Sequence, residues 1–239
     1  FTRNVWDYLD SAVSAPRVSR GQEKLAQLRS QIDPIAKQYG VPAEVLVAIW
    51  GMESSYGQQL GNYSAIRSLA TLAYQGREDR RGFWTKQLLA ALTIIKTGDM
   101  PLNNLRGSWA GAIGHTQFIP TTFEEFAVDF DGDGKRDLRR SIPDALASTA
   151  NFLAKAGYKT AEPWGFEVRL PHTDFRSARK DKMPLAAWRA QGLLLANGRA
   201  LPDSMSSAGL LLPSGPQGPA FLVGKNFETL YSYNASENY

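Results

Sequence analysis

The chain has 239 residues, with 27 Lys and Arg against 23 Asp and Glu, a formal net charge of +4 and no cysteine. Hydrophobic residues make up 43% of it and charged residues 21%, which is typical of a globular protein and excludes a disordered or collagen-like chain. The lack of cysteine excludes disulfides, a thiolate nucleophile and zinc-thiolate sites. Basic residues are scattered, so nucleic acid is not an expected partner. The longest uncharged apolar stretch, Val45 to Met52, is too short for a membrane span, which takes roughly 20 residues.

Four segments in the first two thirds of the chain show the apolar spacing of amphipathic helices. Gly40 and Gly98 mark two of their ends, Pro42 fits a first turn, and the pattern S-I-P-D at 141–144 is a capping box. The expected helices cover Gly21–Tyr39, Pro42 to near Gly57, Phe83–Lys96, and Ser141 to Gly157.

After Gly157 the pattern changes to short apolar runs separated by Pro and Gly turns. We expect strands at Phe166–Leu170, Gly209–Leu212 and Ala220–Val223, and a short helix around Leu185–Gln191. The sequence therefore predicts an α+β protein with a mainly helical core and a small mixed subdomain that contains strands.

Glu53, in the segment G-M-E-S-S-Y-G, is the first candidate for chemistry. On the second helix it shares a face with Leu46 and Trp50, so its carboxyl should emerge from apolar surroundings. Desolvation favours the neutral acid, which can donate a proton to a leaving-group oxygen. The alternative is an ordinary glutamate at a helix end on the surface.

A glycine-rich segment, G-S-W-A-G-A-I-G-H-T-Q-F-I-P, runs from Gly107 to Pro120 between the third and fourth helices. Glycines let a backbone approach a ligand, Ser108 and Gln117 offer hydrogen bonds, and the aromatic residues offer flat surface of the kind that sugars use. A tight structural loop is the alternative. His115 is typical of a packing or hydrogen-bonding residue and is given no catalytic role.

The segment D-F-D-G-D-G-K-R-D at 129–137 matches the first half of a calcium-binding EF-hand loop, with Asp at positions 1, 3, 5 and 9 and Gly at position 6. Position 12 is Arg140, which cannot supply the usual bidentate carboxylate, so Asp144 is expected to do so. Asp144 also fits the capping box begun by Ser141, and the two roles compete. Four aspartates in nine residues repel one another without a cation, which favours a metal loop. The predicted metal ligands are Asp129, Asp131, Asp133, Lys135 and Asp144.

The last ten residues, L-Y-S-Y-N-A-S-E-N-Y, interleave three tyrosines with two asparagines. Aromatic rings beside amides suit a sugar-binding wall. A polar tail that frays at the terminus is the alternative.

Together these motifs resemble the lytic murein transglycosylase B family, whose members have a lysozyme-like helical core and cleave peptidoglycan. The resemblance is strongest from Val41 to Trp164. It is carried by V-P-A-E and G-M-E-S-S-Y-G, S-L-A-T-L-A-Y at 68–74, the glycine-rich segment, D-F-D-G-D-G and A-L-A-S-T-A-N-F at 145–152. The terminal K-N-F-E-T-L-Y-S-Y-N-A-S-E-N-Y from Lys225 also resembles the family pattern.

The resemblance implies that Glu53 is the single catalytic acid/base. The residues it implies for glycan contact are Met52, Ser108, Gln117, Tyr233, Asn234 and Tyr239. His115-Thr116 stands where relatives commonly have Gln-Pro. A family helix is expected to begin near Asn234 and to continue past Tyr239, so we expect the chain to be trimmed there, as at its start, which lacks Met.

By this resemblance, Glu53 protonates the oxygen between N-acetylmuramic acid and N-acetylglucosamine and then accepts the proton of the muramic C6 hydroxyl, which closes a 1,6-anhydro ring. This chemistry needs no cofactor, and a structural Ca²⁺ is the metal expected. Two alternatives stay open. One is a muramidase that uses water, and the other is a noncatalytic cell-wall-binding scaffold in which Glu53 is structural.

The expected domains are a lysozyme-like catalytic domain at 1–165 with the EF-hand-like loop at 129–144, a strand-containing subdomain at 166–224, and a returning segment at 225–239 that completes the substrate cleft. The expected partner is the peptidoglycan glycan strand, with no membrane span and a monomeric state. The resemblance implies a bacterial periplasmic or cell-envelope location.

Overall fold

The computed structural model describes residues 5–237 and 239. Contacts divide the chain into two compact units. We call Ala15–Phe152 the helical unit, and residues 1–14 with 153–239 the sheet unit. The domain limits expected at 165 and 224 describe functional segments, whereas this division follows contacts, so those limits stay a prediction.

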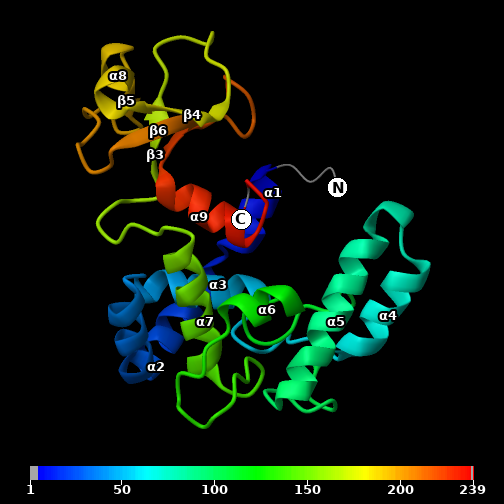
Figure 1. Cartoon of the computed structure of the whole chain (residues 1–239). Helices are drawn as coiled ribbons and strands as arrows, with labels where there is room; N and C mark the ends of the chain where they lie inside the picture. Colours follow the sequence, from blue (N-terminus) through cyan, green and yellow to red (C-terminus); the bar gives the residue numbers. More distant parts are fainter. Residues whose placement is uncertain (1–4, 238) are drawn as a thin grey trace. The chain divides into compact units, whose positions relative to one another are not determined.

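The helical unit is built from helices and one two-stranded sheet (Figure 1). Its elements are α2 (Ala15–Tyr39), α3 (Ala43–Ser54), β1 (Tyr63–Ser64), α4 (Ala65–Gln75), the 3₁₀ helix η1 (Glu78–Arg80), α5 (Arg81–Thr97), β2 (Arg106–Gly107), α6 (Pro120–Phe126) and most of α7 (Ile142–Lys155). The largest fully buried side chains of the described residues all belong to this unit, and Trp50, Phe123 and Leu146 are among them. The helical unit therefore has a large apolar core, to which α3 contributes Leu46 and Trp50.

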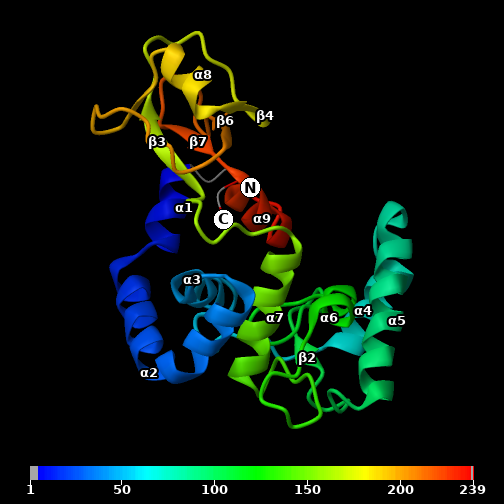
Figure 2. The ribbon, with the colours of Figure 1, turned by 60° about the vertical axis from the view of Figure 1, so that its left-hand side comes forward.

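The four helices expected from apolar spacing are present as α2, α3, α5 and α7. Gly40 takes the left-handed conformation (φ 67°) that lets a helix end there. Helix α2 begins earlier than expected, at Ala15 instead of Gly21, because Pro16 fits a first turn while the polar residues that follow show no apolar period. Helix α4 was not predicted, although Ser64 caps it by accepting a hydrogen bond from the backbone N–H of Arg67. Figures 1 and 2 both show α4 and α5 side by side as a helical hairpin.

The sheet unit contains a five-stranded antiparallel sheet in the order β4-β6-β7-β3-β5 (Figure 2). Its elements are α1 (Val5–Ala12), β3 (Gly165–Arg169), β4 (Ala178–Pro184), α8 (Leu185–Ala190), β5 (Leu194–Leu195), β6 (Ser207–Leu211), β7 (Ala220–Val223) and α9 (Lys225–Tyr233). Trp188 on α8 is buried in the core of this unit and donates a hydrogen bond to the carbonyl of Ala208 on β6. This unit therefore has an apolar core of its own.

The predicted strands near 166–170, 209–212 and 220–223 and the short helix near 185–191 are confirmed as β3, β6, β7 and α8. Strand β4 was not predicted because its sequence, A-R-K-D-K-M-P, is dominated by charge. The α+β fold class with a mainly helical core is confirmed.

One expectation about the end of the chain is wrong. Helix α9 ends at Tyr233, and Asn234 is its C-terminal cap with an extended backbone (φ −135°, ψ 112°), so no helix begins there within the described residues. The N–H of Asn234 instead closes the last turn on the carbonyl of Leu230. No helix among the described residues is both long and apolar enough to span a bilayer.

Candidate active site

Glu53 lies in the last turn of α3, one residue before the helix ends at Ser54, and its side chain is half-buried. Leu46 and Trp50, which helical spacing places on the same face, are 0% and 1% exposed. The predicted helix is therefore confirmed, and the carboxyl stands at the border between the core and the surface of the helical unit.

The backbone after Glu53 is strained. Ser55, Tyr56 and Gly57 are three consecutive residues in the left-handed region, with φ of 50°, 59° and 84°. Such conformations are costly for residues other than glycine and persist only when the surroundings hold them. The hydroxyl of Ser54 provides one such restraint, because it donates to the carbonyl of His115 at 2.6 Å and accepts from the N–H of Gly57 at 3.0 Å.

His115 is buried against this strained turn, with 8% of its surface exposed. Its Nδ1 accepts a hydrogen bond from the indole N–H of Trp50 at 3.0 Å. Burial, and to a smaller extent the positive charge of Arg139, lower the pKa of His115 to about 4, while the negative charge of Asp137 opposes the shift. His115 is therefore a neutral imidazole near pH 7 that accepts through Nδ1.

The glycine-rich segment folds tightly on itself and on a short strand pair. Strand β2 pairs with β1, and Ile113 forms bridges with both Gly107 and Phe118. A Cβ on Gly107 would lie 1.8 Å from the carbonyl oxygen of Ala112, so the chain itself fills the space that this glycine leaves. Tight packing within the loop is therefore sufficient to explain why position 107 is a glycine, and no bound ligand is needed to explain it.

Ser108 and Gln117, the predicted polar contacts, are both half-buried in this segment. The Ser108 hydroxyl oxygen accepts from the N–H of Ala112 at 3.0 Å, which leaves its O–H to donate elsewhere. Gln117 has a left-handed backbone (φ 53°), and its Nε2 donates to the carbonyl of Gly114 at 2.9 Å. Both side chains thus stabilise the loop and keep hydrogen-bonding capacity on its surface.

The structure brings some of the predicted site residues together and assigns others to a different unit. The bond from Ser54 to His115 fixes the end of α3, with Glu53, to the glycine-rich segment. Met52 is half-buried, and its sulfur accepts a hydrogen bond from Arg17 at 3.2 Å. Glu53, Met52, Ser108 and Gln117 all belong to the helical unit, whereas Tyr233, Asn234 and Tyr239 belong to the sheet unit.

Within the sheet unit, the rings of Tyr233 and Tyr239 stack with centroids 6.4 Å apart and planes at 21°. Tyr239 also lines an apolar cavity of about 400 Å³. The other aromatic residues around this cavity are Trp164, Phe221, Phe227 and Tyr231. Tyr231 and Tyr239 therefore contribute to an aromatic surface in the sheet unit, and its role as a sugar-binding wall stays a prediction.

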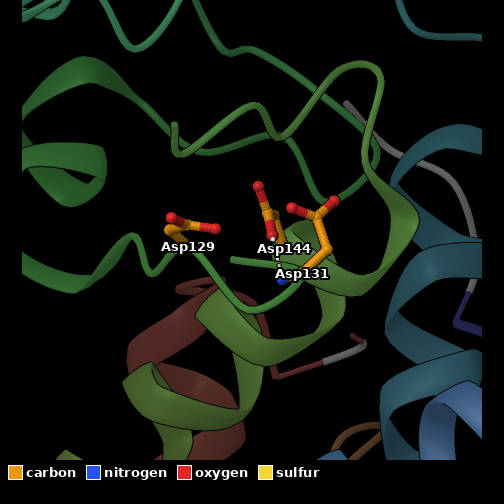
Figure 3. A group of neighbouring side chains, drawn as sticks. All are labelled: Asp129, Asp131 and Asp144. Atoms are coloured by element: carbon orange, nitrogen blue, oxygen red, sulfur yellow. Dashed lines mark hydrogen bonds between the residues drawn. The ribbon is translucent and has the colours of Figure 1, made fainter. Parts of the chain in front are cut away.

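The aspartate loop places three carboxylates around one point. Figure 3 shows Asp144 projecting from α7 toward the loop that carries Asp129 and Asp131. Carboxylate oxygens of these three residues lie within 4.8 Å of one another. Calcium binds oxygen at 2.3–2.6 Å, so two ligands of one ion lie at most about 5 Å apart, and the spacing fits a shared cation.

The Asp144 carboxylate bonds to the backbone of the aspartate loop, and its role as a metal ligand stays a prediction. Its carboxylate accepts from the backbone N–H groups of Phe130, Asp131 and Asp137 at 2.8, 3.3 and 3.0 Å. Ser141 keeps its half of the capping box, because its hydroxyl accepts from the N–H of Asp144. Asp144 is 1% exposed, and burial raises its pKa against the effect of these hydrogen bonds.

Asp133 and Lys135 lie on the exposed part of the same loop, where Asp133 accepts from the N–H of Lys135 at 2.8 Å. Neither belongs to the cluster of three carboxylates. Arg140, at position 12, donates to the Asn104 side chain at 3.1 Å. The roles of Asp133 and Lys135 as metal ligands stay predictions.

The sequence did not indicate two arginines that hold this region together. Arg139 donates to the carbonyls of Gly61 and Arg106, both at 3.0 Å, and so joins the aspartate loop to the strands beside the glycine-rich segment. Arg136 pairs with Asp99, which is 7% exposed, at 2.7 Å. Both links join residues more than thirty positions apart, a separation that carries no signal in a single sequence.

Comparison with known proteins places this chain in a family. The family model described as "Transglycosylase SLT domain" matches residues 1–239, and the chain belongs to this family. A membrane-bound lytic murein transglycosylase B of Escherichia coli (strain K12) is 28% identical over 233 residues, which are 97% of this chain and 63% of that protein.

Two solved structures show the same fold. SltB3 from Pseudomonas aeruginosa, in complex with NAG-anhNAM-pentapeptide, is 52% identical with a TM-score of 0.96 over 100% of this chain and 64% of that one. The Escherichia coli lytic transglycosylase Slt35, in complex with calcium, is 27% identical with a TM-score of 0.86 over 98% of this chain and 74% of that one. The chain spans less than two thirds of the length of SltB3 and of the transglycosylase B.

Proposed function

We propose that this chain is the catalytic part of a lytic transglycosylase that cleaves the β-1,4 bond between N-acetylmuramic acid and N-acetylglucosamine in peptidoglycan. The observation that carries the proposal is the position of Glu53, half-buried at a strained helix end that is bonded to a loop with sugar-compatible groups. A carboxyl fixed in this way suits proton transfer to a glycosidic oxygen.

In the proposed mechanism Glu53 first acts as the acid. It protonates the glycosidic oxygen, N-acetylglucosamine leaves, and an oxocarbenium-like centre develops at C1 of the muramic sugar. The Glu53 carboxylate then accepts the proton of the C6 hydroxyl of the same sugar. The C6 oxygen bonds to C1 and gives a 1,6-anhydro ring, so one residue serves as acid and then as base.

The surroundings of Glu53 support a mechanism with a single carboxyl. Hydrolytic glycosidases use two carboxyl groups about 5 to 9.5 Å apart. The segment 107–119, which is bonded to the turn of Glu53, contains no acidic residue. Glu124 and Glu125 follow it on α6 and are exposed. A neutral His115 with its Nδ1 occupied by Trp50 is not a suitable second acid.

The relative SltB3 supports the anhydro product. It has been solved with NAG-anhNAM-pentapeptide and with NAG-NAM-pentapeptide. An anhydro sugar is the product expected of internal ring closure, whereas hydrolysis gives a reducing end. As the resemblance to the family implies, we propose that the glycan is contacted here by Met52, Ser108, Gln117, Tyr233, Asn234 and Tyr239.

We further propose that the aspartate loop binds a structural Ca²⁺. The spacing of Asp129, Asp131 and Asp144 supports the proposal, as does the calcium in the related Slt35. Asp133 and the backbone carbonyl of Lys135 complete the predicted shell. The ion takes no part in the chemistry, which needs no cofactor. We also propose a location in the bacterial cell envelope, as the resemblance implies, and a monomeric state.

Digestion of purified sacculi tests the proposed function. The protein should release soluble muropeptides whose muramic ends are 1,6-anhydro, as identified by mass spectrometry. Release of reducing ends alone would favour a hydrolytic muramidase. Binding to sacculi without release would favour a noncatalytic scaffold.

A further inference from the structure

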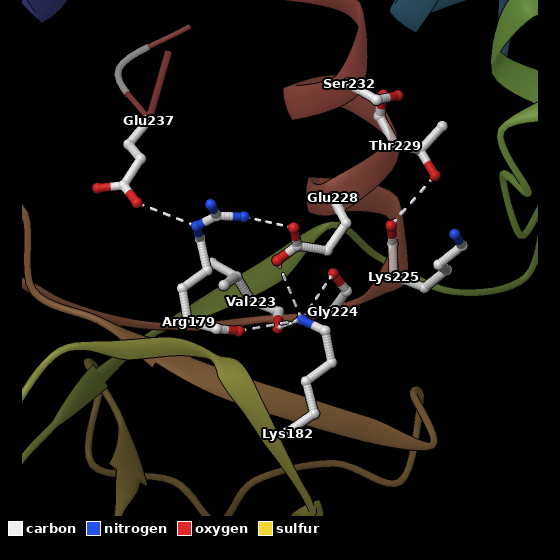
Figure 4. A network of polar contacts seen from close by, with 9 residues as sticks. All are labelled: Arg179, Lys182, Val223, Gly224, Lys225, Glu228, Thr229, Ser232 and Glu237. Atoms are coloured by element: carbon white, nitrogen blue, oxygen red, sulfur yellow. Dashed lines mark hydrogen bonds and ion pairs between the residues drawn. The ribbon is translucent and has the colours of Figure 1, made fainter. Parts of the chain in front are cut away.

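Arg179, on β4, is a buried cation that connects three parts of the sheet unit. Its side chain is 8% exposed. Its Nε donates to the Glu237 carboxylate at 3.0 Å, and its Nη1 pairs with Glu228 on α9. The guanidinium carbon lies 4.1 Å from the ring centroid of Tyr231. Figure 4 shows the guanidinium between the two carboxylates.

Lys182 gives the same helix a second ionic contact. Its Nζ donates to the carbonyls of Val223 and Gly224, at 3.1 and 3.4 Å, and to Glu228 at 3.3 Å. Glu228 therefore keeps a cationic partner if Arg179 is replaced, so its charge is not left unpaired.

The start of α9 is held independently of these charges. Asn226 is 0% exposed, and its amide donates to the carbonyls of Lys159 and Glu162 at 2.8 and 2.7 Å. Its side-chain oxygen accepts from the N–H of Lys159 at 2.7 Å. Loss of the arginine should therefore affect the far end of α9 and the segment after it more than the start.

The terminal segment after α9 is where the arginine contact has most influence. Glu237 is the residue of this segment that pairs with Arg179. Tyr239, two residues after Glu237, stacks on the ring of Tyr233. Tyr231 and Tyr239 both line the apolar cavity. A charge-assisted hydrogen bond at Glu237 thus restrains the part of the chain that carries the aromatic surface.

We propose that Arg179 is a positioning residue for the glycan-binding wall. By binding Glu228 and Glu237 together, it fixes the orientation of Tyr233, Asn234 and Tyr239. This proposal rests on the proposed function, since those three residues are glycan contacts only by the resemblance. A merely structural arginine would change stability alone, whereas a positioning arginine also changes substrate affinity.

Glu237→Ala is the most specific test because it removes the ion pair between Arg179 and Glu237 and leaves Arg179 paired with Glu228. The Glu237 side chain is 45% exposed, so the variant should fold with little change in melting temperature. We expect KM for soluble glycan strands to rise roughly threefold to tenfold, with kcat nearly unchanged because Glu53 is not altered. Glu167→Ala, an exposed acidic residue on β3, is the matched control and should leave KM unchanged.

Substitution of the arginine itself gives a graded series. Arg179→Met should raise KM at least as much as Glu237→Ala. Arg179→Lys should fall between Arg179→Met and wild type, because an ammonium keeps the charge but lacks the planar fork that joins two carboxylates. Lys180→Met, at the exposed neighbouring position, controls for loss of charge on β4.

Hydrogen exchange provides a readout that is independent of activity. Amides of residues 230–237 should exchange faster in Glu237→Ala than in wild type, and those of 159–169 should not change. Wild-type KM with wild-type exchange in Glu237→Ala would overturn the proposal, as would a lower kcat at unchanged KM. If the wild type releases no product, the proposed function fails, and affinity for sacculi in the same variants tests the positioning role separately.

Discussion

At the scale of single residues, the position of Glu53, the proposed acid/base, depends on neighbours that have no proposed chemical role. Ser54, at the end of α3, donates a hydrogen bond to the carbonyl of His115, and Trp50 donates one to Nδ1 of the same residue. His115 stays neutral because burial disfavours its charged form. The end of α3, which carries Glu53, is thus held to the glycine-rich loop by buried hydrogen bonds from Ser54 and Trp50 to His115.

Glu53→Gln should reduce the release of anhydro muropeptides at least about a hundredfold, because an amide keeps the shape but cannot transfer the proton. Melting temperature and sacculus binding should stay near wild type. The initial rate of product release is the measurement, and Glu44→Gln, at an exposed position in the first turn of α3, is the control. Activity above roughly a tenth of wild type would remove Glu53 from the acid role.

His115 should make the protein sensitive to acid. Its pKa is about 4 when folded and 6.5 in the unfolded chain, so the unfolded state binds more protons between these values. Stability should fall as pH drops from 6.5 to 4, by up to roughly 3 kcal/mol, and this contribution should be fully present above pH 6.5. Urea unfolding at several pH values should show a smaller loss in His115→Gln. Equal losses in both proteins would contradict the buried neutral imidazole.

At the scale of elements, the turn after α3 requires glycine at position 57 for two separate reasons. Gly57 has φ of 84°, and a Cβ there would lie 2.5 Å from the His115 ring. Gly98, at the end of α5, has almost the same φ of 83° but open space around it. Substitution at Gly98 therefore measures backbone strain alone, whereas substitution at Gly57 measures the same strain together with a collision with His115.

Gly98→Ala should cost about 1 kcal/mol of unfolding free energy, the cost of a left-handed alanine. Gly57→Ala should cost about 3 kcal/mol or more, because His115 must also move. Urea denaturation gives both values, and only Gly57→Ala should also lower the rate of sacculus digestion. Equal costs at the two positions would show that the contact with His115 has no energetic effect.

The aspartate loop should respond to calcium. An ion that binds only the folded state at a hundred times its Kd adds about 2.7 kcal/mol, which corresponds to a rise in melting temperature of roughly 5 to 10 °C. Magnesium should raise it less, since it prefers a tighter octahedral shell. A calcium titration into metal-stripped protein, followed by thermal unfolding, measures the effect.

Asp131→Ala should reduce the calcium response and leave activity unchanged well below the melting temperature. Glu125→Ala, an exposed acidic change on α6, should leave the response intact. If calcium does not shift the melting of the wild type, the loop is a turn held only by its own side-chain to backbone hydrogen bonds, such as that from the N–H of Gly134 to Asp129 at 2.8 Å.

At the scale of the whole molecule, regular patterns in the sequence predicted the regular parts of the fold. Apolar spacing and glycine stops identified α2, α3, α5 and α7, and short apolar runs identified three of the five strands in the larger sheet. Strand β4 could not be found in this way, because its charged residues are satisfied by long-range partners such as Glu228. The order of the strands also depends on pairings between distant segments.

The candidate site was predictable only in part, for a similar reason. The sequence indicated Glu53, the polar residues of the glycine-rich segment and the cluster of aspartates as candidates, since each lies within a short motif. It did not indicate that Ser54 and His115 join two of these motifs, or that Arg179 holds the terminal segment. Those contacts arise only when the chain folds, and they set the orientation of residues that the motifs merely identify.

Digestion of sacculi in oxygen-18 water tests the central claim most directly. If the C6 hydroxyl of the muramic sugar attacks C1, the released ends contain no oxygen-18 and are one water molecule lighter than hydrolytic ends. We predict such unlabelled anhydro products from the wild type and almost none from Glu53→Gln. Reducing ends that carry one oxygen-18 atom would show that water attacks instead, and would contradict the account.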